Sequence, residues 1–517
     1  MKKTVLYLAT FAILTFNFCS NAQNILGSEK YRPQIHFTPK SGWMNDPNGM
    51  VFVNGEYHLC YQYYPDKTVW GPMHWGHAVS KDLIHWEHLP IALYPDTLGY
   101  IFSGSAVVDK NNTTGFGKDG KAPLVAIYTY HNMNGERAGR NDFQYQAIAY
   151  SNDNGRTWEK YAGNPVLKNP GQRDFRDPKV FWHEPTKSWV MALATYDCVT
   201  IFSSPDLKNW TKQSEFGKEV GKHGANWECP DLFSLKVKGT DKVKWVMTVS
   251  INPGAPFGGS ATQYFIGDFD GKVFHNDYVS KEARWVDYGK DNYAGVTWSN
   301  VPKADGRRLF IGWMSNWQYA DRVPTTTWRS STTLPRELTL IPDVKGAKLI
   351  SFPAKEVESL RNGLSELKPF TLNGVKDISN SGSLAKSPIE IALTFAVDAK
   401  SGKVFGLKLS NDLLEEINIG YDKIKKQLFV DRRKSGVTNF ASEFPEITYV
   451  PCELENGKIE LHLWVDETSI ELFGQRGKAV MTNLFFPTKP YTKLSLFSED
   501  GKVEVKGCKV WKLKSIY

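Results

Sequence analysis

The sequence predicts an all-β protein, a five-bladed β-propeller followed by a C-terminal β-sandwich. Aromatic residues make up 13% of the 517 residues, with 42 Gly and 27 Pro; aromatic side chains fill pleated surfaces, whereas Gly and Pro favour turns. From Ile35 to Ile341, short apolar runs alternate with clusters of Gly, Asn, Asp and Pro, and no window has a long helical period. A chain of this length is expected to divide into about two to four domains. These observations exclude an all-helical or disordered protein.

Residues 1–22 have the pattern of a signal peptide. Two lysines precede an apolar run at residues 5–18, and small residues stand at Ser20 and Ala22, the two positions that a signal peptidase reads. We therefore expect export, to the periplasm, the cell surface or the medium, with cleavage after Ala22. Cys19 leaves a lipid anchor open, although the bulky residues before it disfavour one. No run approaches about 18 uninterrupted apolar residues, so no membrane span is predicted.

Residues 33–345 are predicted to form the propeller. A turn that carries a small or acidic residue and leads into a strand recurs about every sixty residues, at Asp46-Pro47, Ser103-Gly104, Asp177-Pro178, Glu228-Cys229-Pro230 and Ala294-Gly295. Units of that length, each rich in short strands, fit propeller blades better than sandwich hairpins. In a propeller the innermost strands run close to one central axis, so polar residues at their starts are expected to converge there.

The remainder of the chain is predicted to form a linker and a second β domain. Residues 346–364 are assigned to the linker, with a short helix at 354–361 that ends at Asn362-Gly363. Residues 365–517 return to alternating strands separated by turn clusters, which favours a β-sandwich.

Charge and cysteine content narrow the classes of function. The chain has 63 basic and 55 acidic residues and a formal charge of +8, with no basic run or stripe of the kind that nucleic acid requires. Six cysteines occur without CxxC or His-paired spacing, so a zinc site is not expected. A chain of this size needs no disulfide staple, and we expect mostly free, buried thiols.

Three acidic motifs could carry chemistry. The segment Trp43–Gly49 places Asp46 in a turn, and Arg176 sets a fixed positive charge beside Asp177, which is expected to lower the pKa of that carboxyl and keep it ionised. Glu228 lies between a tryptophan and a cysteine, apolar neighbours that favour a retained proton. Each motif alone is compatible with a structural turn or strand end. Together they give one ionised and one protonated carboxyl group, the pair that glycoside cleavage requires.

Groups suited to a sugar lie between these acids. Aromatic rings stack on the apolar face of a sugar, whereas amides and hydroxyls bind its alcohols; the candidates are Gln62, Trp70, His74, Trp75, Ser103 and Trp313. Trp43, directly ahead of the Asp46 motif, is expected to serve as an aromatic platform. Any one of these tryptophans could instead belong to the core.

These motifs closely resemble glycoside hydrolase family 32, the invertase, inulinase and levanase group. The resemblance extends from about Pro33 to the carboxyl terminus, where Val465–Phe473 is similar to the sandwich domain of those enzymes. It is carried by the segments Trp43–Gly49, Gln62-Tyr63, Phe102–Ser105, Arg176–Pro178, Glu228-Cys229, Gly289–Asp291 with Tyr293–Gly295, and Gly312–Met314.

The resemblance implies a retaining mechanism on β-linked fructofuranosides. It implies that Asp46 is the nucleophile that attacks the anomeric C2, that Glu228 is the general acid and later the base, and that Asp177 holds ring hydroxyls and stabilises the transition state. It further implies a terminal-fructose pocket lined by Asn45, Gln62, Trp70, Phe102, Ser103, Arg176 and Trp313. Neither a metal nor a cofactor is implied.

The function expected from the resemblance is a secreted, exo-acting fructan β-fructosidase that releases fructose from levan or inulin and also acts on sucrose. An endo-acting levanase that produces fructo-oligosaccharides stays open, because rim loops rather than the three acids separate the two modes. An inverting arabinan or xylan hydrolase and a non-catalytic carbohydrate-binding protein are less favoured. Fructan or sucrose is the expected partner, and the sandwich is expected to pack on the propeller more than to bind sugar. Linkage preference and oligomeric state are not predicted.

Overall fold

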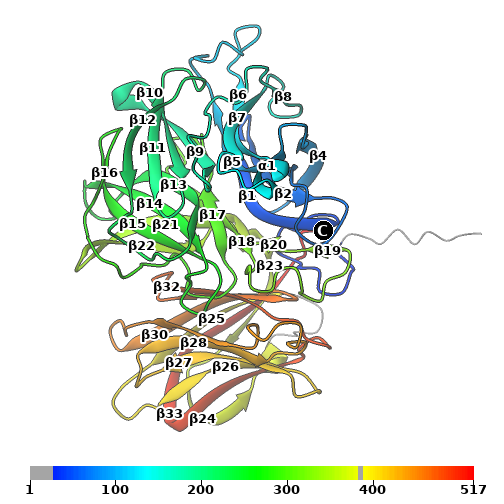
Figure 1. The fold of residues 1–517 in the computed structure, drawn as a ribbon. Helices are drawn as coiled ribbons and strands as arrows, with labels where there is room; N and C mark the ends of the chain where they lie inside the picture. The colour runs from blue at the N-terminus through cyan, green and yellow to red at the C-terminus, as the bar shows by residue number, and fades with distance from the viewer. Residues whose placement is uncertain (1–26, 382–387) are drawn as a thin grey trace, which may run out of the picture.

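The computed structural model describes residues 27–381 and 388–517, and its fold is almost entirely β (Figure 1). The predicted signal peptide, including Cys19 and Ala22, lies outside these residues. Within the two described ranges, no helix has the length and apolar character needed to cross a bilayer. The predicted order of a five-bladed propeller followed by a sandwich is confirmed.

Within residues 27–381, five antiparallel sheets form the blades. Blade one comprises β1 (Gly42–Val53), β2 (Glu56–Tyr64), β3 (His74–Ser80) and β4 (Glu87–Leu93). Blade two comprises β5 (Tyr100–Val108), β6 (Leu124–His131), β7 (Gln144–Ser151) and β8 (Glu159–Lys160), with helix α1 (Met133–Arg137) between β6 and β7. Blade three comprises β9 (Arg176–His183), β10 (Ser188–Ala194), β11 (Val199–Ser204) and β12 (Thr211–Phe216), with the 3-10 turn η1 (Glu184–Thr186). Blade four comprises β13 (Asn226–Lys236), β14 (Val243–Asn252), β15 (Ala261–Phe269) and β16 (Phe274–Asn276). Blade five comprises β17 (Tyr293–Thr297), β18 (Arg308–Met314), β20 (Ser331–Thr332), β21 (Arg336–Asp343) and β22 (Gly346–Pro353).

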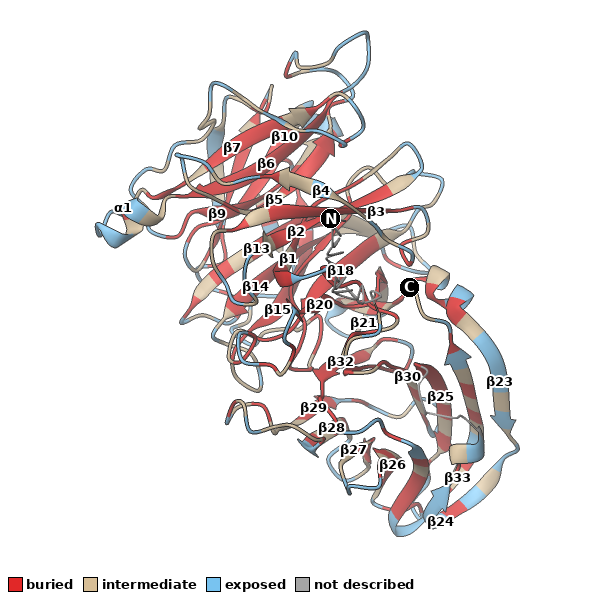
Figure 2. Ribbon diagram, turned by 90° about the vertical axis from the view of Figure 1, so that its right-hand side faces the viewer, coloured by how far each residue is buried: buried red, intermediate tan, exposed pale blue. Residues whose placement is uncertain are grey.

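The first strand of each blade lies at the central axis. β1, β5, β9, β13 and β17 contact one another in a ring, which closes where β17 meets β1. A short strand between β18 and β20 in the chain, β19 (Trp328–Arg329), pairs with β1 in parallel and ties the last blade to the first. The second strands, such as β6 and β10, are buried on both faces because they lie between neighbouring blades (Figure 2). Their continuous apolar sequence follows from that position.

The second domain is an eleven-stranded sheet in the described part of residues 361–517, and it folds over into a sandwich. Its strands are β23 (Arg361–Leu367), β24 (Phe370–Asp377), β25 (Ile389–Ala396), β26 (Val404–Ser410), β27 (Glu416–Asp422), β28 (Gln427–Lys434), β29 (Ile447–Pro451), β30 (Lys458–Val465), β31 (Ser469–Gly474), β32 (Ala479–Leu484) and β33 (Lys493–Leu513). The long β33 belongs to both layers, because its first part pairs with β26 and its second part with β25. A 3-10 turn, η3 (Ser379–Ser381), follows β24.

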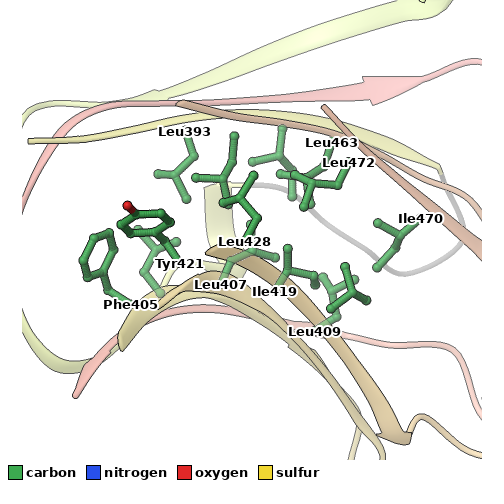
Figure 3. Close-up of a cluster of buried hydrophobic side chains, with 14 of the residues drawn as sticks. Leu393, Phe405, Leu407, Leu409, Ile419, Tyr421, Leu428, Leu463, Ile470 and Leu472 are labelled. Carbon is green, nitrogen blue, oxygen red and sulfur yellow. The ribbon is translucent and has the colours of Figure 1, made fainter. Parts of the chain in front are cut away.

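Alternation along these strands builds the sandwich core. Leu393, Leu463 and Leu472 extend from one layer and meet residues such as Leu407 and Ile419 from the other (Figure 3). All five are fully buried. A side chain of this kind contributes about 1.5–3 kcal/mol when it is removed from water, so the domain has a substantial core of its own.

The segment predicted to be a linker, residues 346–364, is structured. β22 pairs with β21 along its whole length and forms the outer strand of blade five. A 3-10 helix, η2 (Lys355–Leu360), replaces the predicted helix, and β23 begins at Arg361. Gly363, expected to cap that helix, lies within β23 at a shift of register and has a φ of +81°. The difference arises because residues 346–353 alternate between buried and partly exposed positions, which is a strand pattern.

Buried charges join the two domains. Glu471 in β31 accepts hydrogen bonds from Arg336 of blade five, at 3.0 Å from Nε and 2.5 Å from Nη2, and from His36 Nε2 at 2.9 Å. Arg336 also donates to Asp287 at 2.9 Å, and His36 Nδ1 lies 2.7 Å from Asp466. Because these side chains are almost completely buried, each charge depends on its partners for stabilisation.

His36 makes this junction sensitive to alkaline pH. Burial alone would lower the pKa of His36, but the hydrogen bonds and charges of Asp466 and Glu471 raise it from its usual 6.5 to about 9. The protonated form therefore stabilises the folded state fully below pH 6.5, and this contribution is lost as the pH rises through 9. Chemical unfolding at a series of pH values should show a loss of about 3 kcal/mol across that window. In His36→Gln that pH dependence should disappear; a wild-type profile that persists in the variant would contradict the assignment.

Candidate functional site

The predicted acids lie on the innermost strands, at equivalent positions. Asp46, Asp177 and Glu228 belong to β1, β9 and β13, and blades two and five place Ser103 and Tyr293 at the corresponding points of β5 and β17. The strand pairing shifts register next to each of these residues, at 44–47, 101–104, 176–179, 228–231 and 293–296. The sequence interpretation of these five motifs as turns ahead of strands is therefore wrong. They are bulges inside strands, which break the alternation of side chains and redirect one of them.

Asp46 is held by three neighbouring groups. Ser103 Oγ donates to Asp46 Oδ2 at 2.7 Å, and Asn45 Nδ2 donates to Oδ1 at 3.0 Å. The Cys229 thiol contacts Oδ2 at 3.4 Å. Burial raises the pKa of Asp46, and the negative charge of Glu228 raises it further. These contacts join blades one, two and four at a single carboxylate.

Asp177 is anchored through the backbone on both sides. Its own N–H donates to Thr129 Oγ1 at 3.0 Å, and the Cys229 N–H donates to Asp177 Oδ2 at 3.0 Å. Asp177 has a φ of +64°, a left-handed conformation that non-glycine residues adopt rarely and that is common at functional sites. Burial raises the pKa of Asp177 to about 7, although the charge of Arg176 opposes this change.

Glu228 lies between a guanidinium and a phenol. Arg176 donates to Glu228 Oε1 at 3.0 Å from Nη2 and 3.3 Å from Nε. The hydroxyl of Tyr293 hydrogen-bonds to Oε2. The sequence neighbours of Glu228 predicted apolar surroundings for its carboxyl group. This prediction is wrong, because the carboxyl group is bonded to Arg176 and Tyr293. The cause is local geometry, because Trp227 is fully buried next to the acid and points elsewhere.

Arg176 does not act as its position in the sequence suggests. Its guanidinium donates to Asp174 at 2.5 Å and to Glu228, whereas its Nε is 3.9 Å from Asp177. The prediction that Arg176 holds the pKa of Asp177 low is thus contradicted. Several carboxylates share one positive charge here, and like charges at close range cannot all ionise easily. The pKa values of Asp46 and Asp177 are therefore raised, even though Arg176 lies nearby.

The remaining predicted residues form the walls of the site. Asn45, Ser103 and Arg176 touch the acids directly, as described above. Gln62 lies behind these residues. Its Nε2 donates to Asn48 Oδ1 at 2.8 Å and to the carbonyl of Ile101 at 3.0 Å. It therefore fixes the strand that carries Ser103.

Aromatic residues predicted for the pocket occupy the rim of blades one and two. Phe102 stacks on His131 with ring centroids 4.2 Å apart, and Trp70 meets the Phe102 ring edge-on at 6.0 Å. Trp70 remains 38% exposed. Trp75 is buried and donates its Nε1 to the Phe102 carbonyl at 3.0 Å, so it supports the rim. His74 bonds the carbonyl of Pro72 and holds its own loop.

A second aromatic cluster lines the blade-five side. Trp313 is fully buried against Trp317 and Tyr293, with centroid distances of 4.8 Å and 6.3 Å. Its indole N–H has no hydrogen-bond partner among the described residues, an uncommon state for a buried donor. Trp43 is not the exposed platform that was expected. It is completely buried, and its Nε1 donates to Asn45 at 2.8 Å, which orients that amide toward Asp46.

A small cavity continues along the axis beneath the acids. Its walls include Pro47, Pro178 and Pro230, the prolines that follow the three acidic positions. In the described part of the chain, no three His, Cys, Asp or Glu side chains are placed to hold a metal ion. The carboxylates of Asp46, Asp177 and Glu228 are groups that can carry out proton transfer and nucleophilic attack.

Several residues of the site had no role in the sequence interpretation, among them Asp174 and Thr129, described above, and two aromatic residues. Tyr293, within one of the recognised motifs, bonds Glu228, and Trp317 stacks on Trp43 with centroids 5.8 Å apart. Neither contact has a local sequence signal, because each joins segments that are distant along the chain. The one available signal was the position of Tyr293, which in the fifth repeated unit corresponds to the positions of the acids in the other units.

Comparison with known proteins places the whole chain in one family. Residues 36–353 match the glycosyl hydrolases family 32 N-terminal domain, and residues 356–512 match the family 32 C-terminal domain. A levanase of Bacillus subtilis is 50% identical over 508 residues, which cover 98% of this chain and 74% of the relative. An extracellular exo-inulinase of Aspergillus ficuum is 39% identical over 92% of this chain and 93% of its own length. The crystal structure of the exo-inulinase from Aspergillus awamori superimposes with a TM-score of 0.87 at 37% identity, covering 95% of this chain and 99% of that one. The chain therefore belongs to glycoside hydrolase family 32.

Proposed function

We propose that this protein is a retaining β-fructosidase that removes terminal fructose from levan or inulin and also hydrolyses sucrose. The convergence of Asp46, Asp177 and Glu228 from three blades, around one hydroxyl-binding site, supports this proposal most strongly. The names of its relatives, a levanase and exo-inulinases, are consistent with the same substrate class.

In the proposed mechanism the two steps use Asp46 and Glu228. Asp46, oriented by Ser103 and Asn45, attacks the anomeric C2 while Glu228 gives its proton to the leaving oxygen. A fructosyl-enzyme ester results, and water then attacks it as Glu228 takes a proton back. Asp177 holds ring hydroxyls and faces the positive charge that develops at C2.

The raised pKa of Asp46 predicts a fall of the rate in acid. Burial and the negative charge of Glu228 raise this pKa, and only the ionised carboxylate can attack C2. The rate on sucrose should therefore fall at acid pH as Asp46 becomes protonated. The apparent value belongs to the group of interacting carboxyls as a whole.

Tyr293→Phe should lower the rate. The Tyr293 hydroxyl donates to Glu228 and holds that carboxyl in position. We expect kcat on sucrose to fall roughly 10- to 100-fold, in line with loss of a buried hydrogen bond to a charged group. Measured kcat values test this, with a thermal melt close to that of the wild type as the control for folding. An unchanged kcat would show that Tyr293 does not position Glu228.

Chromatography of early products from levan, inulin and sucrose tests the proposed function. Fructose as the sole early product from both polymers is the expected result. A ladder of oligosaccharides would instead indicate endo action, and absence of any release from the three substrates would overturn the proposal.

We also propose that the protein is exported from the cytoplasm. Export is supported by the pattern of residues 1–22 and by relatives that are named extracellular. With cleavage after Ala22, the mature protein should begin at Gln23. A mature protein that begins at an acylated Cys19 would instead be attached to the membrane by a lipid anchor.

A further inference from the structure

We propose that an aromatic strip formed by Phe257, Tyr449 and Phe429 binds the part of a fructan chain that leaves during cleavage. The inference rests on the proposed function and adds to it the place where the rest of the polymer lies. The strip joins a loop of blade four to the outer face of the sandwich.

The position of Glu228 sets the direction in which the leaving chain extends. As the proposed acid, Glu228 must face the oxygen of the leaving group, so the chain leaves the site on the side of blade four. Glu228 pairs with Ser250, and two residues earlier Asn226 pairs with Asn252, the last residue of β14. Two residues of strand span about 7 Å, so the loop at residues 253–260 begins at the same end of blade four as the acid, about 7 Å further along the strand direction.

This loop is built to hold one shape. Gly254 and Gly259 bond across it at 2.9 Å, and its far end is tied to blade five, where the Trp317 N–H donates to Ser260 Oγ at 3.2 Å. Gly258 has a φ of +81°, and a Cβ there would lie 2.9 Å from Gln318. The loop is therefore close-packed against the neighbouring blade, and it fixes the partly exposed ring of Phe257.

The sandwich continues the aromatic surface. The rings of Phe257 and Tyr449 meet edge-to-face, with centroids 4.8 Å apart. Tyr449 is 47% exposed on the edge strand β29, between the buried residues Thr448 and Val450. It pairs directly with Phe429 in β28, and directly opposed residues share a face of the sheet. Strands β29, β28 and β27 follow one another away from the propeller (Figure 2), so the strip runs outward from the loop.

The chemistry of the strip suits a neutral polysaccharide. A fructan carries no charge, and its rings offer C–H faces on which aromatic side chains stack. An exposed tyrosine that leans on a fixed phenylalanine is held in place before binding, which reduces the entropy lost when the ligand binds. The leaving group of sucrose is a single glucose, which is expected to reach only the loop at residues 253–260. A longer fructan can extend past the loop to Tyr449 and Phe429.

Replacement of Tyr449 by Ala tests the strip. We expect kcat/KM on polymeric levan or inulin to fall about five- to tenfold, the equivalent of one aromatic contact, while kcat/KM on sucrose stays unchanged and reports an intact site. Tyr449→Phe retains the ring and should keep wild-type activity on both substrates. Tyr278→Ala removes a comparably exposed tyrosine next to β16, away from the strip, and should have no effect on either substrate.

The outcomes separate the inference from the proposed function. If Tyr449→Ala and the double variant Tyr449→Ala/Phe429→Ala hydrolyse polymer and sucrose in the wild-type ratio, the strip does not bind fructan. Equal losses on both substrates would likewise overturn the inference, because they indicate a structural effect. If the wild-type protein releases fructose from none of these substrates, the proposed function itself fails.

Discussion

Asp46→Asn should abolish turnover, with a loss in kcat of roughly 10⁴-fold or more. The substituted amide has nearly the shape of the carboxylate and can keep contacts to Asn45 and Ser103, but it cannot attack C2. Fructose release from sucrose and levan gives the measurement, and a thermal melt close to that of the wild type excludes unfolding as the cause. Retention of substantial turnover would remove Asp46 as the nucleophile.

A companion variant separates the nucleophile from the acid. Glu228→Gln cannot supply a proton, so release of poor leaving groups should be slow, whereas activated leaving groups that need no proton should be released in a rapid burst. Asp46→Asn should show no such recovery, since no leaving group compensates for a missing nucleophile. If both variants responded alike to the leaving group, the two roles would not be distinct.

Glu471→Gln should destabilise the protein by about 3–5 kcal/mol, the cost of breaking a buried ion pair. Glu471 neutralises both Arg336 and protonated His36 in a fully buried junction. The variant leaves each of these charges with a single carboxylate, Asp287 for Arg336 and Asp466 for His36. Unfolding by denaturant, followed by tryptophan fluorescence, measures the change.

A surface pair provides the matched control. Lys478 and Glu455 lie 2.6 Å apart on the surface, with side chains 38% and 47% exposed, so Lys478→Ala should cost less than about 1 kcal/mol. Glu471→Gln within 1 kcal/mol of the wild type would show that the junction contributes little to stability.

The sequence was sufficient to predict the architecture and which acids meet. The spacing of the five motifs reflects the repeat of blades, and alternation identified the sandwich. Neither the spacing of the motifs nor the alternation could show that the motifs are bulges, because a bulge depends on which residue of the partner strand lies opposite. The end of blade five was also misplaced, since a partly exposed outer strand resembles a linker.

The charged partners of the site residues were predicted least well, because the sequence analysis inferred them from neighbours along the chain. Arg176 stands next to Asp177 in the chain, yet its guanidinium bonds Glu228 of the next blade. The bulge at residues 176–179 interrupts the regular alternation of side chains along β9, so the partners of each side chain cannot be inferred from its neighbours in the sequence. Glu228 likewise takes its partners from blades three and five.

The sandwich also contributes to the site from a distance. Arg432 in β28 donates to Asp291 at 2.6 Å and to the hydroxyl of Tyr319 at 2.9 Å. Asp291 lies two residues before Tyr293, and Tyr319 two residues after Trp317. The sandwich thus supports both segments that approach Glu228 and Trp313, which gives its packing on the propeller a role in positioning.

Mass spectrometry of trapped enzyme tests the central claim most directly. Glu228→Gln lacks the base for the second step, so incubation with a fructoside that has an activated leaving group should accumulate a fructosyl-enzyme. We predict a mass increase of one fructosyl unit, located by peptide mapping at Asp46. A label on Asp177 or another residue, or a burst of leaving group without any covalent adduct, would contradict the account.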